Sequence, residues 1–142
     1  MTLIKTIGLD YYIQPVLALD RISLHNAWFP ETTLSVLGFG RNSEGKFLII
    51  VEQPYIKGSV MTDEEIADFA KKLGFTLLNP KNWTFATADV YLSDLHDENV
   101  IKSAEGNVFV IDCDIRINTP ALRCGGNRTL TNGVKCHLPS PK

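Results

Sequence analysis

The sequence predicts an α+β domain. Two pairs of apolar segments rich in Val, Ile, Leu and Phe, within residues 34–53 and 100–111, flank short turns that contain Gly, as is typical of β-hairpins. Two other segments, residues 15–28 and 62–74, carry apolar residues at helical spacing. The chain has 142 residues, of which 44% are hydrophobic and 21% charged, so its size and composition suit one globular domain.

The chain opens with a short apolar segment, residues 2–5, that ends at Lys5 and is predicted to be a strand. A helix is expected over residues 16–28, because Pro15 suits the first helical turn and Pro30 stops the helix soon after its end. Its expected buried stripe consists of Leu17, Leu24 and Trp28.

A hairpin follows, with strands expected at residues 34–39 and 46–53 and a turn at residues 41–45. The second strand runs into Glu52, Gln53 and a proline. This ending is also typical of an edge strand terminated by proline.

The clearest helix begins at Thr62, which forms a capping box with Glu65, and ends at Gly74. Residues 77–83 are expected to be a loop, and residues 84–91 a single strand.

A second hairpin is expected from residues 100–102 and 107–111, joined by a four-residue turn at residues 103–106 that ends in Gly. Beyond Arg116, residues 123–142 have few apolar side chains and predict an irregular tail.

Three polar residues stand out within the apolar segments around the second hairpin: Asp94, Asn99 and Asp112. Because a hairpin returns the chain to its starting point, Asn99 should lie beside Asp112. Asp94 is five residues before Asn99 and should face the same cleft.

Carboxylate and amide oxygens are the donors that Mg²⁺ takes from proteins, usually one or two carboxylates with phosphate and water completing the octahedron. A second carboxylate nearby can orient or deprotonate a hydroxyl group. Asn99 and Asp112 carry oxygen donors of this kind, and Asp94 carries a further carboxylate; the resemblance described next implies that Asn99 and Asp112 hold Mg²⁺ and that Asp94 acts on a hydroxyl.

The order and spacing of these residues resemble the catalytic and metal-binding loops of kinases, where D-x-x-x-x-N is followed one hairpin later by a second Asp. The Asp-Leu-His sequence from Asp94 to His96 is closer to aminoglycoside phosphotransferase-type members than to ordinary protein kinases. Over its whole length the chain is most similar to the shortened kinase-like domains of polyvalent proteins from phages and conjugative elements.

This resemblance implies a protein-kinase-like fold with a partial N-terminal lobe at residues 1–53 and a minimal C-terminal lobe at residues 54–122, so that the domain spans residues 1–122. It implies ATP and Mg²⁺ as cofactors and a Ser/Thr or small-molecule hydroxyl as acceptor. His96 would support the catalytic loop or approach the phosphates.

The resemblance also implies binding roles in the first lobe. Lys5 would contact the α and β phosphates and pair with Asp20, the only acid of the first helix, unless Lys5 is simply a surface lysine. Backbone groups around Glu52 and Gln53 would meet the adenine edge.

Two features depart from the kinase pattern: the first weakens the resemblance, and the second favours an alternative function. Leu92 stands where His is usual, two residues before the catalytic Asp, and no G-x-G-x-x-G loop precedes Lys5. The alternative is a non-catalytic module of a mobile genetic element that binds a nucleotide or a protein partner.

Charge and cysteine content exclude other classes. A net charge of −2 offers no general attraction to nucleic acid or to an anionic membrane, so neither is expected as a partner. No membrane span or signal peptide is expected, which predicts a cytoplasmic protein. The three cysteines, Cys113, Cys124 and Cys136, are expected to be free thiols; a zinc site formed by the last two with His137 would have an unusual spacing.

Overall fold

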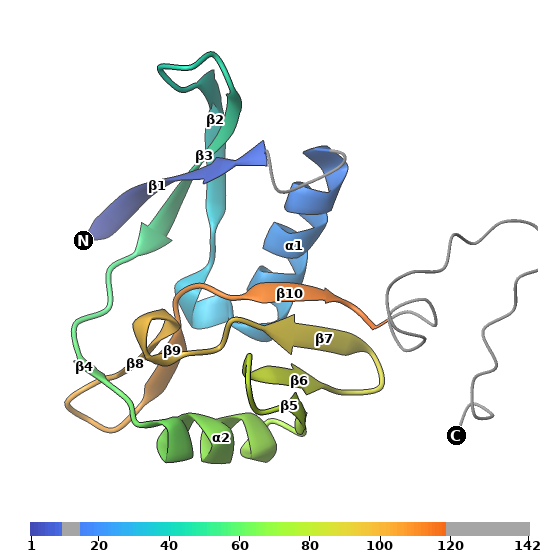
Figure 1. The fold of residues 1–142 in the computed structure, drawn as a ribbon. Coiled ribbons are helices and arrows are strands. Elements are labelled where there is room, and N and C mark those ends of the chain that lie inside the picture. Colours follow the sequence, from blue (N-terminus) through green and yellow to red (C-terminus); the bar gives the residue numbers. More distant parts are fainter. Residues whose placement is uncertain (10–14, 119–142) are drawn as a thin grey trace, which may run out of the picture.

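The structure is a computed structural model that describes residues 1–9 and 15–118 (Figure 1). In these residues two α-helices combine with three small antiparallel sheets, which confirms the α+β prediction. The expected tail at residues 123–142, Cys124, Cys136 and His137 lie outside the described residues.

The first sheet consists of β1 (Thr2–Gly8), β3 (Phe47–Pro54) and β2 (Ser35–Arg41), in the order β1-β3-β2. The hairpin prediction is confirmed, with Gly45 at a φ of 78° in its turn. β1 is longer than expected. β3 is the central strand, with β1 on one side and β2 on the other, so the edge-strand alternative for residues 46–53 is wrong.

Helix α1 (Pro15–Trp28) covers the first sheet, and the short 3-10 helix η2 (Pro30–Thr32) follows it (Figure 1). The buried residues of α1 are Ala18, Ile22 and His25. The stripe expected from the sequence is partly wrong, because Leu17 is 44% exposed, whereas Leu24 and Trp28 pack against the core. Ala18 and Ile22 join Leu34, Ile49 and Val51 in a core beneath the first sheet.

The second sheet has the order β10-β7-β6-β5 and consists of β5 (Thr76–Asn79), β6 (Thr84–Ala86), β7 (Val90–Ser93) and β10 (Asp114–Ile117). Two predictions are wrong here. The expected loop at residues 77–83 begins as strand β5, and the expected strand at residues 84–91 is two strands joined by a turn in which the N–H of Thr87 bonds the carbonyl of Val90 at 2.9 Å.

The third sheet has the order β4-β8-β9, with β4 (Ser59–Val60), β8 (Val100–Lys102) and β9 (Val108–Val110). The β8–β9 hairpin confirms the second hairpin prediction. The 3-10 helix η3 (Asp97–Asn99) leads directly into β8.

Helix α2 (Asp63–Lys72) has the predicted capping box, in which Thr62 accepts the N–H of Glu65 at 3.2 Å. Ile66 and Ala70 enter a second core, which also contains Phe85, Leu92 and Ile115 of the second sheet. Neither helix in the described part of the chain is long and apolar enough to cross a membrane.

Gly58 precedes β4 at a point where the chain passes very close to β8. A Cβ atom at this position would lie 2.3 Å from the carbonyl oxygen of Lys102 and 2.5 Å from Cγ2 of Ile101. We expect Gly58→Ala to lower the free energy of unfolding by about 1–3 kcal/mol, because backbone must move to admit the methyl group. Chemical denaturation measures this, with Gly38→Ala as control, since its Cβ would meet nothing within 4 Å. A Gly58→Ala variant as stable as the control would contradict the close approach.

Candidate functional site

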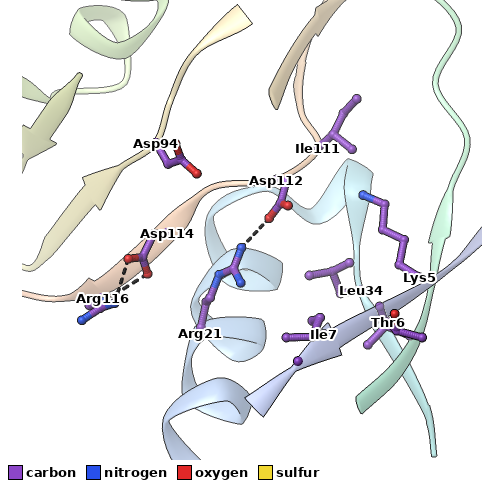
Figure 2. Close-up of a pocket in the computed structure, with 12 residues that line it drawn as sticks. Lys5, Thr6, Ile7, Arg21, Leu34, Asp94, Ile111, Asp112, Asp114 and Arg116 are labelled. Atoms are coloured by element: carbon purple, nitrogen blue, oxygen red, sulfur yellow. Dashed lines mark hydrogen bonds and ion pairs between the residues drawn. The ribbon is translucent and has the colours of Figure 1, made fainter. Parts of the chain in front are cut away.

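A cavity of about 480 Å³ lies between the first sheet with α1 and one end of the β7–β10 strand pair, where Asp94 follows β7 and Asp112 precedes β10 (Figure 2). Its apolar wall includes Ile7, Leu34 and Val51. Its charged lining consists of three cations and three carboxylates: Lys5, Arg21, Arg116, Asp94, Asp112 and Asp114. Four of these charges are paired with one another, Arg21 with Asp112 and Arg116 with Asp114.

Asp94 directly follows β7 and has a φ of 63°, in the left-handed region that non-Gly residues seldom adopt. The loop that begins at Asp94 is closed by a hydrogen bond from Asn99, whose side-chain nitrogen donates to the carbonyl of Asp94 at 2.8 Å. This conformation leaves the Asp94 side chain 63% exposed and at the cavity (Figure 2). Unfavourable backbone conformations held in place by neighbours are frequent at functional sites.

His96 contacts the Asp94 carboxylate, with Nε2 lying 3.0 Å from Oδ1. Its Nδ1 accepts the backbone N–H of Glu98 at 3.3 Å. That bond requires an unprotonated Nδ1, so in the neutral imidazole the proton is on Nε2, which lies closer to Asp94 Oδ1 than to the amide nitrogen of Asn99 at 3.3 Å. His96 therefore orients the carboxylate, and it is not among the residues that line the cavity.

Asn99 and Asp112 are neighbours, as the hairpin predicts. The carbonyl of Asn99 accepts the backbone N–H of Ile111 at 2.8 Å and that of Asp112 at 3.5 Å. The turn between the two strands contains Gly106 at a φ of 87°, which allows the tight reversal. Asp112 lines the cavity, whereas Asn99 is not part of the lining.

Lys5 reaches the cavity from the middle of β1, and its Nζ donates to Oε1 of Gln53 at 2.6 Å. Burial lowers the pKa of Lys5, while the nearby Asp112 carboxylate acts in the opposite direction. The expected pair with Asp20 is not formed: within the described residues Lys5 bonds Gln53, and Asp20 lies exposed on α1.

The residue that α1 presents to the cavity is Arg21, which the sequence interpretation missed. Its Nη2 donates to Oδ1 of Asp112, and its Nε donates to the carbonyl of Cys113 at 2.8 Å. Arg21 is three residues after Ala18 and four before His25, so identifying those two as the buried face would have placed Arg21 beside it.

Glu52 and Gln53 do not line the cavity. Glu52 has strand neighbours on both sides, Ile4 and Ser35, so its backbone lies within the sheet. The Gln53 side chain is fully buried, and its Nε2 donates to the carbonyls of Thr32 and Ile111, both at 2.8 Å. Gln53 therefore connects Lys5 to the segment that carries Asp112, instead of offering its side chain to a ligand.

Buried His25 braces this connection. Its Nε2 lies 3.0 Å from the carbonyl oxygen of Thr32 and 3.1 Å from the Thr32 hydroxyl, which donates to the carbonyl of Val110 at 2.5 Å. Burial lowers the pKa of His25, which favours the neutral imidazole. The strand that ends just before Asp112 is thus tied to α1 and η2.

Asp114 and Arg116 complete the charged lining from β10. The guanidinium of Arg116 donates to both carboxylate oxygens of Asp114, at 3.0 and 2.8 Å (Figure 2). Since this carboxylate is already bonded through both oxygens, Asp94 and Asp112 are the better candidates for contact with a ligand.

The donor set agrees with Mg²⁺ carried by a phosphate ligand. No cluster of three or more His, Cys, Asp or Glu residues able to hold a metal is present in residues 1–9 and 15–118, so these residues form no cage of their own. Mg²⁺ bound together with phosphates needs only one or two protein carboxylates. Asp112, with Asn99 against its backbone, meets that requirement.

Comparison with known proteins identifies a family. Residues 1–119 match the model of a family described as a serine/threonine/tyrosine kinase found in polyvalent proteins. No curated protein and no solved structure matches the chain. The match includes every residue of the cavity lining and confirms the resemblance drawn from Asp94, Asn99 and Asp112. The chain therefore belongs to the kinase family found in polyvalent proteins.

Proposed function

We propose that this kinase-family domain binds ATP with Mg²⁺ in the cavity and transfers a phosphoryl group to a hydroxyl. The observation that carries the proposal is the presence of Asp94 and Asp112 on one cavity opposite Lys5 (Figure 2). Phosphoryl transfer depends on placing charge around the phosphates and on orienting the attacking hydroxyl. A cation, a metal-binding carboxylate and a second carboxylate are the groups required.

In this proposal, Asp112 holds Mg²⁺ from the cavity lining, and Asn99, which is bonded to the backbone of Asp112 but is not part of the lining, supplies a second oxygen from beside it. Mg²⁺ when bound would neutralise charge on the phosphates. The Asn99 amide nitrogen is bonded to the Asp94 carbonyl, so its Oδ1 is the atom left to serve as a ligand. Lys5 contacts the phosphates, and Ile7, Leu34 and Val51 offer the base an apolar surface.

Asp94 orients the acceptor hydroxyl or takes up its proton. His96 keeps the carboxylate in position through the 3.0 Å contact with Oδ1. The core under the first sheet would belong to a shortened N-terminal lobe, and the core around α2 and the second sheet to a minimal C-terminal lobe.

A second candidate function is a non-catalytic module that binds a nucleotide or a protein. It is favoured by the ion pair between Arg21 and Asp112, because a guanidinium occupies the carboxylate on which Mg²⁺ would depend. The two candidates differ in whether Mg²⁺ strengthens nucleotide binding and whether phosphate is transferred.

Thermal unfolding with ATP, with and without Mg²⁺, tests the proposed function. At about 100 times the dissociation constant, MgATP should raise the free energy of unfolding by roughly 2.7 kcal/mol, which is several degrees for a domain of this size. ATP without Mg²⁺ should give a smaller rise. No rise at millimolar MgATP would reject the nucleotide site, and a rise that is the same without Mg²⁺ would favour the non-catalytic module.

A further inference from the structure

Arg21 joins the wall formed by α1 to the segment that carries Asp112 (Figure 2). Its side chain is 18% exposed, whereas that of Asp112 is 54% exposed. The Arg21 side chain is therefore mostly buried at the edge of the cavity, whereas the Asp112 carboxylate is more exposed and accessible to a ligand.

Arg21 donates two bonds to the segment that carries Asp112, and they differ in kind. Nε donates to the backbone carbonyl of Cys113 at 2.8 Å, an anchor that does not depend on any charged side chain. Nη2 donates to the Asp112 carboxylate. A guanidinium has a planar fork of five donors, so it can keep the first bond while its terminal nitrogens change partner.

Mg²⁺ at Asp112 would lie close to this guanidinium, and the two cations would repel each other and compete for the same carboxylate. Phosphate groups change the balance, because a guanidinium binds phosphate oxygens through two parallel hydrogen bonds. Lys5 reaches the same cavity from β1, so the cations of β1 and α1 converge there.

We propose that Arg21 is a phosphate-binding residue that serves as the counter-ion of Asp112 in the nucleotide-free protein and turns to the nucleotide's phosphates when Mg²⁺ takes the carboxylate. This inference rests on the proposed function. With Arg21 in this role, the site binds Mg²⁺ and the polyphosphate together, and it binds Mg²⁺ alone only weakly.

Removing the guanidinium should therefore have two opposite effects. In Arg21→Gln, binding of Mn²⁺ without nucleotide should become tighter by up to about fivefold, because the metal no longer displaces a partly exposed ion pair. Binding of MgATP should become weaker by about tenfold or more, because a charge-assisted bond to phosphate is lost.

The measurements are Mn²⁺ titration of the nucleotide-free protein by electron paramagnetic resonance, and MgATP titration by calorimetry. Arg41→Gln is the matched control, since Arg41 lies over the Phe47 ring in the first hairpin and does not line the cavity. Arg21→Lys keeps the positive charge without the fork, and it should retain weak Mn²⁺ binding but lose part of the affinity for MgATP. Circular dichroism checks that each variant is folded.

If the parent protein binds MgATP and folded Arg21→Gln binds both ligands as the parent does, the inference is overturned and the proposed function stands. The inference is also overturned if Arg21→Gln weakens both ligands equally, since Arg21 then only supports the structure. Should Arg21→Gln fail to fold, Arg21→Lys decides: unchanged MgATP affinity rejects the role of the fork. A parent protein that binds no MgATP rejects the inference and the proposed function together.

Discussion

Asp94→Asn should reduce phosphoryl transfer from ATP by about 100- to 10,000-fold while leaving MgATP binding unchanged. An amide cannot take the proton of the acceptor hydroxyl, but its oxygen can still accept a hydrogen bond from His96. Asn is also one of the few residues that tolerate a positive φ, so the 63° backbone conformation should persist. Release of labelled phosphate from ATP, and its transfer to the protein itself, measure turnover without a known acceptor.

Asp97→Asn is the matched control for this variant. Asp97 belongs to the same loop, is exposed and lies 3.8 Å from Nδ1 of His96, and it is outside the cavity lining. The turnover of the Asp97→Asn variant should equal that of the parent protein. Full turnover in folded Asp94→Asn would remove Asp94 from the proposed role, whatever its position in the cavity.

The sequence predicted the elements whose signals are local. The capping box of Thr62 and Glu65 marks the start of α2, and Gly45 and Gly106 mark two hairpin turns with positive φ. In each case the energetic preference is decided within a few residues, so neighbouring elements do not need to be known.

Predictions that depended on packing were less successful. Residues 77–83 contain Asn, Pro and Lys, which suggest a loop, yet Leu77 and Asn79 pair with Phe85 and Thr84 of β6. The partner strand decides this outcome, since strand preference varies strongly with its surroundings. On α1, Leu17 has the hydrophobicity of a core residue, but the small Ala18 occupies the position against the sheet.

In the candidate site, too, the residues set by local spacing were predicted and those set by packing were not. Spacing along a hairpin correctly placed Asn99 beside Asp112, because a hairpin determines which of its residues meet. It also placed Asp94 at the cavity that Asp112 lines. The position of Arg21 at the cavity depends on the rotation of α1 about its axis. The burial of Gln53 depends on which face of β3 is covered. Those are tertiary features, and as a result the expected partner of Lys5 was Asp20, whereas the observed one is Gln53.

The Mg²⁺-dependent part of ATP binding should disappear in Asp112→Ala. The variant loses the carboxylate that would hold the metal, so at ligand concentrations where the parent gains roughly 2.7 kcal/mol it should gain no more with Mg²⁺ than without. The fold itself should persist, because the ion pair that is lost is partly exposed and such pairs contribute at most about 1 kcal/mol. Arg21 then has no carboxylate partner at residue 112, so binding of ATP without metal should be retained or strengthened.

Thermal unfolding with ATP alone and with MgATP measures both effects, and Asp68→Ala on α2 is the control, since Asp68 is exposed and outside the cavity lining. A folded Asp112→Ala variant that responds to Mg²⁺ as the parent does would show that the metal binds elsewhere. Loss of ATP binding both with and without Mg²⁺ would mean that Asp112 shapes the cavity, because removing one negative charge near Lys5 and Arg21 should otherwise favour the phosphates.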